Sequence, residues 1–396
     1  MYVLLIYALL TAAVCCIIFR QEKRNEKNEW ILYGIIAVFF LIRFSIGQDT
    51  EGYSWMFHIL DSPLGDLSSH MMRNPGYTFL NYLVKITFGE FRYFVLLSNQ
   101  NILGLCSYTV YKHSRNSLFS LLLFVGSGML EVYYGSGMKQ GLAMAVYLFA
   151  FYEFLPKKKY LWYIIFILAA ASFQEVALIL LIVPLLERFA DRFAKNPYRI
   201  TLIVSFIAWC LSWLINKYAI RLEYMITEQT GYAPVWTHLL AYFHRRSFSY
   251  AGSAMEIVFL LGVMLMCYFA DKSRWDRFRW MEIMTFVYSC VLYYLFAGYS
   301  IMSRASDLIQ IIQLIMIPNL LSEIPGMRKK LAAAAAVFAV NAVLLYTDIS
   351  VKCTQVSENG RLDITVAKFP YITVFEKARI DALFPEENEP EADMNR

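Results

Sequence analysis

Long apolar stretches recur along the chain from residue 2 to residue 347, and they constrain its fold more than any other feature. A helix needs about 20 apolar residues to cross the core of a bilayer. Only 17% of the 396 residues are charged, against roughly 25% in an average soluble domain, which excludes an ordinary cytosolic enzyme. We therefore expect an all-α, polytopic membrane protein with about twelve transmembrane helices. The candidate spans are residues 2–19, 30–46, 91–111, 117–135, 141–155, 160–174, 176–186, 200–220, 251–270, 280–298, 305–321 and 331–347.

A thirteenth stretch, residues 76–88, is short for a crossing and contains Lys85, so we expect a re-entrant or interfacial segment there. If it does not cross, one face carries 20 basic residues, and the positive-inside rule makes that face cytoplasmic and places both termini outside. If residues 76–88 crossed the membrane, the basic cluster at 157–159 would lie outside, so the positive-inside rule disfavours a crossing. The 20 residues are Arg20, Lys23, Arg24, Lys27, Lys112, Arg115, Lys157, Lys158, Lys159, Arg188, Arg192, Lys195, Arg199, Lys272, Arg274, Arg277, Arg279, Arg328, Lys329 and Lys330.

The stretches define one transmembrane domain, residues 1–347, with outer-face loops at residues 47–75 and 221–250. Residues 348–396 form a polar C-terminal tail. The net charge of +5 is small and follows from the loop charges, so we expect no nucleic-acid partner. No internal repeat of fixed period is visible, which argues against a transporter built from two similar halves.

The chain lacks the sequence motifs of several kinds of chemistry. Six of the seven cysteines lie in apolar stretches without CxxC spacing, which is typical of packing residues. The five histidines form no HExxH or other metal-binding spacing, and neither a GxSxG elbow nor a phosphate-binding GxxxxGKS/T loop is present. We therefore expect no metal, no cofactor, no hydrolysis and no use of ATP.

Ionisable and aromatic residues gather at the outer ends of the predicted spans. An ionisable residue inside a span costs about 2.5 to 3.5 kcal/mol, so it usually faces a cavity or a partner. Single cations at an interface can also be snorkelling side chains, and helix-end glutamates such as Glu153 and Glu256 are typical hydrogen-bonding groups between helices. Six outer cations together instead favour a cationic cavity for an anionic ligand, because arginine matches phosphate with paired hydrogen bonds. The candidate residues are Arg43, Asp49, Tyr53, Arg73, Tyr77, Tyr133, Tyr134, Lys139, Gln140, Gln174, Glu175, His244, Arg245, Arg246 and Arg304.

The chain resembles the EpsG/Wzy-type polysaccharide polymerases of bacterial envelopes. RFSIGQDTEGYSWMF (43–57) resembles the family's arginine-led G-x-D-x-x-x-Y segment, and GSGMKQGLAMA (135–145), with its continuation to SFQE (172–175), resembles its R-Q-x-x-A and F-H stretch. SRASDLIQIIQLIMIP (303–318) resembles its late arginine-bearing helix, and KFPYITVF (368–375) resembles its closing P-Y segment. The likeness covers nearly the whole chain.

Three positions depart from the family pattern. Lys139 stands where the family usually has arginine, which keeps the charge but loses the paired hydrogen bonds. Gln174 stands where the family usually has histidine, so no imidazole base is available there. Asn74 precedes Pro75 where an acidic residue is expected, so the sugar contacts of this loop can differ.

The resemblance implies a glycosyltransferase that joins oligosaccharide repeat units on undecaprenyl pyrophosphate, on the outer side of the bacterial inner membrane. Arg43, Lys139 and Arg304 would hold the pyrophosphate. A carboxylate, Asp49 first and Glu175 second, would accept the proton of the acceptor hydroxyl. The tyrosines and the 221–250 loop would form sugar platforms and a lid. Expected partners are the lipid-linked oligosaccharide, membrane lipid, a chain-length regulator and a flippase.

Two other functions remain open on the sequence alone. A ligase that transfers finished lipid-linked glycan to another acceptor uses the same substrate on the same side. A transporter of lipid-linked oligosaccharide uses similar cations, but it should place some of them in the middle of several spans.

Overall fold

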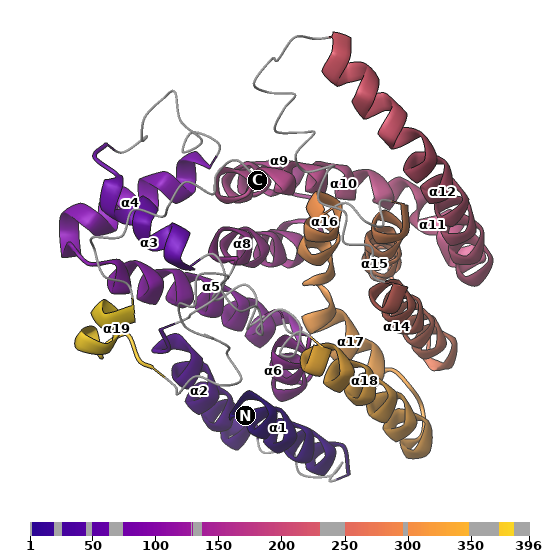
Figure 1. Ribbon diagram of the computed structural model, residues 1–396. Helices are drawn as coiled ribbons and strands as arrows, with labels where there is room; N and C mark the ends of the chain where they lie inside the picture. The colour runs from indigo at the N-terminus through magenta and orange to yellow at the C-terminus, as the bar shows by residue number, and fades with distance from the viewer. Residues whose placement is uncertain are drawn as a thin grey trace. The chain divides into compact units, whose positions relative to one another are not determined.

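The computed structural model describes residues 2–19, 26–44, 50–62, 74–127, 129, 137–229, 250–295, 300–347 and 372–383. Within these ranges every regular element is a helix, which confirms the all-α prediction (Figure 1). The first helices are α1 (Tyr2–Phe19), α2 (Glu26–Leu41), α3 (Thr50–Ile59), α4 (Pro75–Phe88), α5 (Phe91–His113), α6 (Ser117–Gly126), α8 (Met138–Phe154) and α9 (Tyr160–Phe173). The later ones are η2 (Glu175–Ile182), α10 (Val183–Leu186), η3 (Glu187–Phe189), α11 (Ala190–Lys195), α12 (Pro197–Gln229), α14 (Tyr250–Phe269), α15 (Arg277–Leu295), α16 (Ser300–Gln310), α17 (Gln313–Ser322), α18 (Met327–Thr347) and α19 (Lys377–Leu383).

Ten of the twelve predicted apolar stretches form a helix that begins within four residues of the predicted start. The stretch at 176–186 instead forms the 3-10 helix η2 followed by the short α10. The stretch at 305–321 is divided into α16 and α17, which are bent by 42°. At this bend the backbone N–H of Ile312 donates to the carbonyl of Ile309 at 3.4 Å, an i to i−3 bond that tightens the turn.

Two described helices are long and apolar enough to cross a membrane, within Pro197–Leu214 and Met327–Tyr346, and the bent α16–α17 pair would make a third. The expected count of about twelve spans is therefore not confirmed. One reason is that polar residues interrupt long helices: α5 has 23 residues but contains the sequence SNQN at its centre. Four shorter apolar segments are Glu29–Leu41, Ser117–Gly126, Tyr160–Phe173 and Glu256–Phe269.

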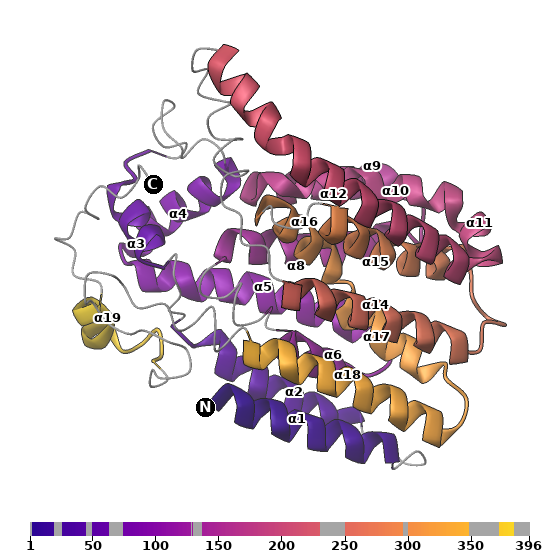
Figure 2. The same ribbon diagram turned by 45° about the vertical axis from the view of Figure 1, so that its right-hand side comes forward.

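The chain divides into two units, residues 1–175 with 334–396, and residues 176–333. In the first unit α5 lies between α8 on one side and α2 with α6 on the other, and α9 flanks α8 (Figures 1 and 2). The rings of Phe149 and Phe166 join α8 to α9, with centroids 5.3 Å apart. The hydroxyls of Tyr33 and Ser107, 3.0 Å apart, join α2 to α5.

Helices α1, α6 and α18 meet where α6 ends in a glycine. The Tyr7 hydroxyl donates a 2.7 Å hydrogen bond to the carbonyl of Phe338. A Cβ at Gly126 would collide with the Tyr7 ring and come within 3.0 Å of the Asn341 side chain. The absence of a side chain at Gly126 therefore lets the three helices approach closely.

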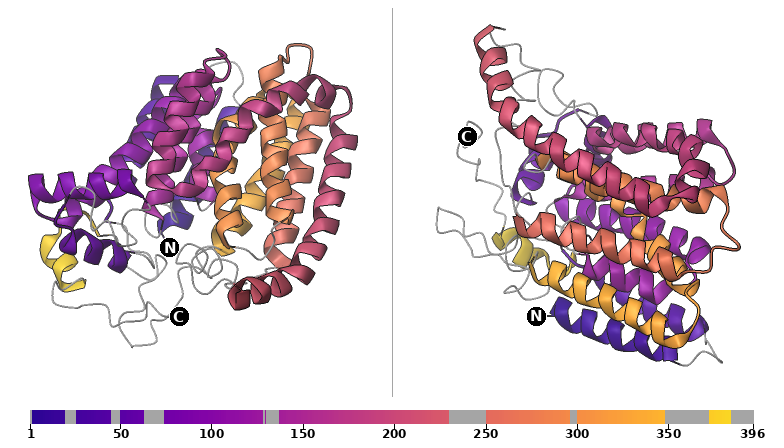
Figure 3. Two further views of the ribbon diagram at one scale, coloured as in Figure 1. Left: turned by 90° about the horizontal axis from the view of Figure 1, so that it is seen from above. Right: turned by 90° about the vertical axis from the view of Figure 1, so that its right-hand side faces the viewer.

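Helix α4 occupies the stretch for which we expected a re-entrant or interfacial segment. Its 14 residues extend about 21 Å, less than the roughly 30 Å of a bilayer core, and α3 and α4 are inclined to α5 and α8 (Figure 3, left). The ammonium group of Lys85 donates to the carbonyls of His58 and Leu60 at 2.6 and 2.8 Å. Lys85 thereby satisfies carbonyls at the C-terminal end of α3, a helix that we did not expect within the 47–75 loop.

Part of the predicted C-terminal tail pairs with the end of α2. The N–H of Phe44 donates to the carbonyl of Ile372 at 2.8 Å, and the N–H of Val374 donates to that of Ile42 at 2.9 Å. These bonds form an antiparallel bridge between Arg43 and Thr373. The tail therefore contributes backbone to a segment that carries a predicted site residue.

In the second unit, α15 packs against α11, α12, α14 and α16. Arg279 lies near the start of α15, where it is buried and pairs with Glu282 and, at 3.2 Å, with Glu323. The Trp275 indole N–H donates to Glu323 at 2.9 Å. Arg279 was predicted as a loop cation, but α15 begins earlier than the apolar stretch and takes it into the helix.

Candidate functional site

The structure describes about half of the candidate residues. Arg43, Tyr53, Tyr77, Lys139, Gln140, Gln174 and Glu175 belong to the first unit, and Arg304 belongs to the second. The remaining predictions, Asp49, Arg73, Tyr133, Tyr134, His244, Arg245 and Arg246, lie outside the described residues.

Lys139 lies against two aromatic rings at the start of α8. Its ammonium nitrogen is 4.7 Å from the ring centroid of Tyr77 and 5.6 Å from that of Tyr53. The two ring centroids are 5.6 Å apart, and Tyr53 and Tyr77 are only 8% and 1% exposed. A cation over an aromatic face is stabilised by about 0.5 to 2 kcal/mol. The rings carry no net charge, so this contact holds the lysine without neutralising it.

The position of Lys139 within its helix strengthens the local positive potential. It is the second residue of α8, which begins after Gly137. The N-terminus of a helix carries a partial positive charge and presents backbone N–H groups to anions. A lysine there is disfavoured by the helix dipole, so the two aromatic faces offset a local electrostatic cost. The lysine and the helix end together favour an anion at this place.

Tyr77 is fixed by the packing of α4 against α5 and α9. Its ring meets the Phe94 ring edge-on at 5.3 Å. The preceding residue, Gly76, lies so close to Ser172 of α9 that a Cβ would collide with the serine side chain and approach its carbonyl to 3.2 Å. The end of α9, which leads into Gln174 and Glu175, therefore lies beside the start of α4.

The end of α2 is held by Asn99, which was not among the predicted site residues. The Asn99 amide donates to the carbonyls of Leu41 and Arg43 at 3.3 and 3.0 Å. Asn99 is fully buried and Arg43 is 5% exposed. Together with the bridge to Thr373, these bonds fix the backbone of Arg43 from two sides. The signal that could have identified Asn99 is the polar SNQN sequence inside an apolar stretch, because such residues usually bond between helices.

Lys139 and the Arg43 backbone lie at about the same level of the first unit. Helices α5 and α8 meet at their C-terminal ends, where His113 Nε2 and Glu153 Oε1 are 2.9 Å apart. Asn99 lies 14 residues before His113, and Lys139 lies 14 residues before Glu153. At 1.5 Å per residue both positions are about 21 Å from that junction. The structure thus brings two of the candidate regions, separated by almost 100 residues, to one depth.

The other candidates in this unit differ in exposure. Gln140 is buried in the first turn of α8. Gln174 follows α9 in an extended conformation, and its N–H donates to the carbonyl of Ala170 at 3.0 Å. Glu175 is exposed and begins η2. An exposed carboxylate three residues beyond Ser172 is accessible to a ligand that reaches the start of α4.

In the second unit, Arg304 is an exposed residue of α16, and the buried face of that helix carries a polar network. Gln310 Nε2 donates to Glu256 Oε2 at 2.9 Å. The Ser306 hydroxyl donates to the carbonyl of Ser289 at 3.0 Å. These bonds join α14, α15 and α16, and they confirm that Glu256 serves as a hydrogen-bonding group between helices. The network fixes the helix on which Arg304 stands.

Comparison with protein families matches residues 29–360 to a model described as the EpsG family. This match covers more than half of the chain and confirms the resemblance found in its sequence. It includes Arg43, Lys139, Glu175 and Arg304, and it ends before the segment that pairs with α2. No curated protein and no solved structure matches the chain.

Proposed function

The chain belongs to the EpsG family, and from this premise we propose that it is a membrane polysaccharide polymerase. It is a glycosyltransferase that joins oligosaccharide repeat units carried on undecaprenyl pyrophosphate. It acts without a metal on the periplasmic or outer face of the bacterial inner membrane. The observation that carries the proposal is Lys139, held over two buried aromatic rings at the level of the Arg43 backbone.

The reaction needs stabilisation of a leaving group rather than an activated nucleotide. The acceptor hydroxyl oxygen attacks the anomeric carbon of the donor sugar, the bond from that carbon to the pyrophosphate oxygen breaks, and the electron pair leaves with the lipid pyrophosphate. Positive groups fixed in advance where this negative charge develops lower the barrier. Lys139 and the N-terminus of α8 supply such charge beside two buried aromatic rings, with Arg43 and Arg304 as the further proposed cations.

A carboxylate accepts the proton that the attacking hydroxyl loses. Asp49 is the first candidate and Glu175 the second, and the exposure of Glu175 beside the start of α4 supports its access to substrate. Gln174 and Gln140 are proposed substrate contacts at the same helix ends. The burial of Tyr53 and Tyr77 favours a role through Lys139 over direct stacking on a sugar. The remaining substrate-binding assignments are Arg73, Tyr133, Tyr134, His244, Arg245 and Arg246.

The length distribution of surface glycan in the source organism tests this function. The strains carry the wild type, a deletion, or one of three variants, Arg43→Ala, Lys139→Ala and Arg304→Ala, with protein level measured by immunoblot. We expect each variant to reduce the ladder to single repeat units that still reach the surface. Arg115→Ala is the matched control, because Arg115 is an exposed cation between α5 and α6, and its ladder should stay normal.

Two results would overturn the proposal. A normal ladder in all three variants would remove these cations from the reaction. Loss of all surface glycan, with lipid-linked repeat units accumulating inside the cell, would instead favour a transporter.

A further inference from the structure

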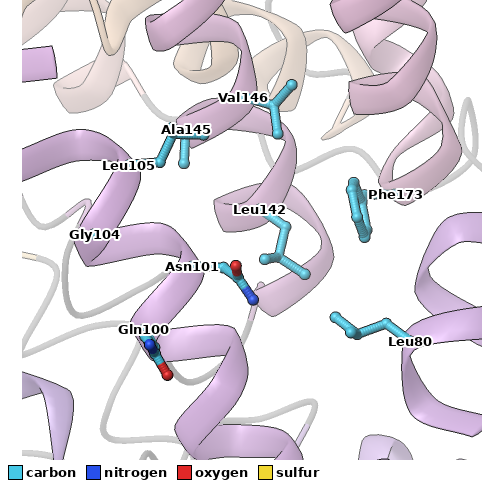
Figure 4. A pocket seen from close by; sticks show the side chains of 9 residues that line it. All are labelled: Leu80, Gln100, Asn101, Gly104, Leu105, Leu142, Ala145, Val146 and Phe173. Atoms are coloured by element: carbon cyan, nitrogen blue, oxygen red, sulfur yellow. The ribbon is translucent and has the colours of Figure 1, made fainter. Parts of the chain in front are cut away.

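A cavity of about 480 Å³ lies within the first unit, between α4, α5, α8 and α9. Its volume is within the roughly 300 to 1,000 Å³ typical of small-molecule sites. Figure 4 shows Leu80, Asn101, Leu142 and Phe173, from the four helices, around the same space. Most of the lining is apolar, and the polar contribution comes from the amides of Gln100 and Asn101.

The cavity begins one helical turn from the Lys139 cluster. Leu142 follows Lys139 by three residues on α8, and Leu80 follows Tyr77 by three residues on α4. Along α8 the lining extends from Leu142 to Val146, or from about 4.5 to about 10 Å beyond Lys139 at 1.5 Å per residue. A ligand whose charged end meets Lys139 can therefore continue directly into an apolar space.

The lining of the cavity changes from polar to apolar with increasing distance from Lys139. Gln100 and Asn101 follow Asn99, which lies at the level of Lys139, so their amides belong to the end of the cavity near the cation. One turn further along α5, Gly104 faces the part of α8 that carries Ala145 and Val146. This order matches a lipid with a polar head and a hydrocarbon chain.

The cavity is accessible from outside the protein and is wide on one side. Gln100, Asn101 and Gly104 are exposed, whereas Leu142 and Ala145 on the opposite wall are buried. A Cβ built at Gly104 meets no atom within 4 Å. Small residues at 104 and 145 leave width for a methyl-branched chain, which is bulkier than a straight acyl chain.

We propose that this cavity binds the isoprene units next to the pyrophosphate of the polyprenyl carrier. The proposal rests on the proposed function, because it assumes that Lys139 holds the pyrophosphate. The rest of the carrier leaves through the open α5 side into the bilayer. The cavity thus fixes the position of the leaving group by its hydrocarbon as well as by its charge.

Binding of undecaprenyl pyrophosphate to the purified full chain in phosphatidylcholine nanodiscs tests the proposal. Gly104→Leu fills the cavity from a position with free space and improves helix propensity, so we expect it to fold. We expect it to weaken binding about tenfold or more with an unchanged melting temperature. Gly34→Leu is the matched control, because a Cβ at Gly34 of α2 also meets no atom within 4 Å, and its binding should equal that of the wild type.

A Lys139→Met variant separates this proposal from the proposed function. If Lys139→Met weakens binding and Gly104→Leu does not, the cavity assignment is wrong and the function stands. If the wild type does not bind the carrier, or Lys139→Met binds it as tightly as the wild type, the proposed function fails. If phosphatidylglycerol displaces the carrier at equal concentration from the wild type but does not bind Gly104→Leu, the cavity is a bilayer-lipid site and the proposal is overturned.

Discussion

The two ends of α8 hold cations in different ways. At its N-terminal end, Lys139 lies over the neutral rings of Tyr53 and Tyr77. At its C-terminal end, the Glu153 carboxylate accepts hydrogen bonds from Lys112, His113 and Lys157 at 2.5 to 2.9 Å. The two aromatic rings add no charge of their own beside Lys139, whereas the Glu153 carboxylate adds a negative charge beside its partners.

This difference assigns different tasks to the two ends. The Glu153 cluster joins α5 to α8 and continues into the turn between α8 and α9. It therefore fixes how α5 and α8 are aligned along their lengths, and this alignment places Asn99 and Lys139 at the same depth. The Lys139 cluster is positioned by that alignment, and its two aromatic rings add no negative charge. We therefore expect the C-terminal end of α8, at Glu153, to determine stability and the N-terminal end, at Lys139, to determine activity. Substitutions can test the two expectations separately.

The largest effect is expected at Lys139. Replacement by methionine keeps an apolar stem against the rings but removes the charge, and loss of one preorganised charge typically lowers a rate by about 100-fold to 1,000-fold. Lys139→Arg should keep most of the polymerisation, because a guanidinium also stacks on aromatic faces and restores the residue usual in the resembling family. Glycan ladder length and the rate of repeat-unit joining in membranes measure both. Equal activity in Lys139→Met and the wild type would contradict the assignment of activity to the Lys139 end of α8.

Local sequence patterns predicted most of the helix starts and the place where α8 begins. The apolar stretches located ten helix starts, and the glycines before Lys139 indicated where α8 begins. The stretch at 76–88 forms the 14-residue helix α4, and its short length and Lys85 are both visible in the sequence. These features depend on residues within one or two helical turns of each other.

Long-range pairing could not be predicted in the same way. The bridge between Arg43 and Thr373 joins residues 330 positions apart, and backbone bonds of this kind leave no pattern in the side chains. Asn99 holds α2 only because α5 packs there, and the burial of Tyr77 depends on the contact of Gly76 with Ser172. The sequence therefore identified Lys139, Tyr53 and Tyr77 as candidates, but not that the two rings hold the lysine.

The second prediction concerns the aromatic face itself. Tyr77→Leu removes the ring whose centroid lies 4.7 Å from the Lys139 ammonium nitrogen. The lost contact stabilises the position of Lys139 by about 0.5 to 2 kcal/mol. A loss of about 1.4 kcal/mol would lower the joining rate about tenfold. Tyr77→Phe retains the face and should stay within about twofold of the wild type. The joining rate distinguishes the two, with the melting temperature as a control for folding. If Phe and Leu lower the rate equally, the hydroxyl rather than the ring face is what matters.

The third prediction applies to the opposite end of α8. Glu153→Gln leaves Lys112, His113 and Lys157 without their carboxylate partner, and loss of charge-assisted bonds of this kind costs about 2 kcal/mol of unfolding free energy. Thermal unfolding of the purified protein measures this loss, and the glycan ladder should remain normal at permissive temperature. Lys157→Met is the control, because this lysine is half exposed and its ion pair contributes less. A shortened ladder in Glu153→Gln with unchanged stability would reverse the assignment of the two ends.

The smallest effect is expected where ion pairs hold the tail. A hydrogen bond from Arg92 lowers the pKa of Glu90 below its usual value, and Lys377 of α19 adds to this at 3.1 Å. Because the folded-state pKa is lowered, the contribution to stability is complete above the usual glutamate pKa of about 4.3 and is lost as the pH falls further.

The difference in melting temperature between the wild type and Glu90→Gln should therefore be constant from about pH 5 to pH 8 and should shrink below about pH 4. Asp61→Asn serves as a control, because the Asp61 side chain is 94% exposed beside Lys85 and such pairs contribute little. Since the tail pairs with the backbone of Arg43, Glu90→Gln should also lower the joining rate slightly at neutral pH. A melting difference that grows on acidification would show that Glu90 does not stabilise the fold through its charge.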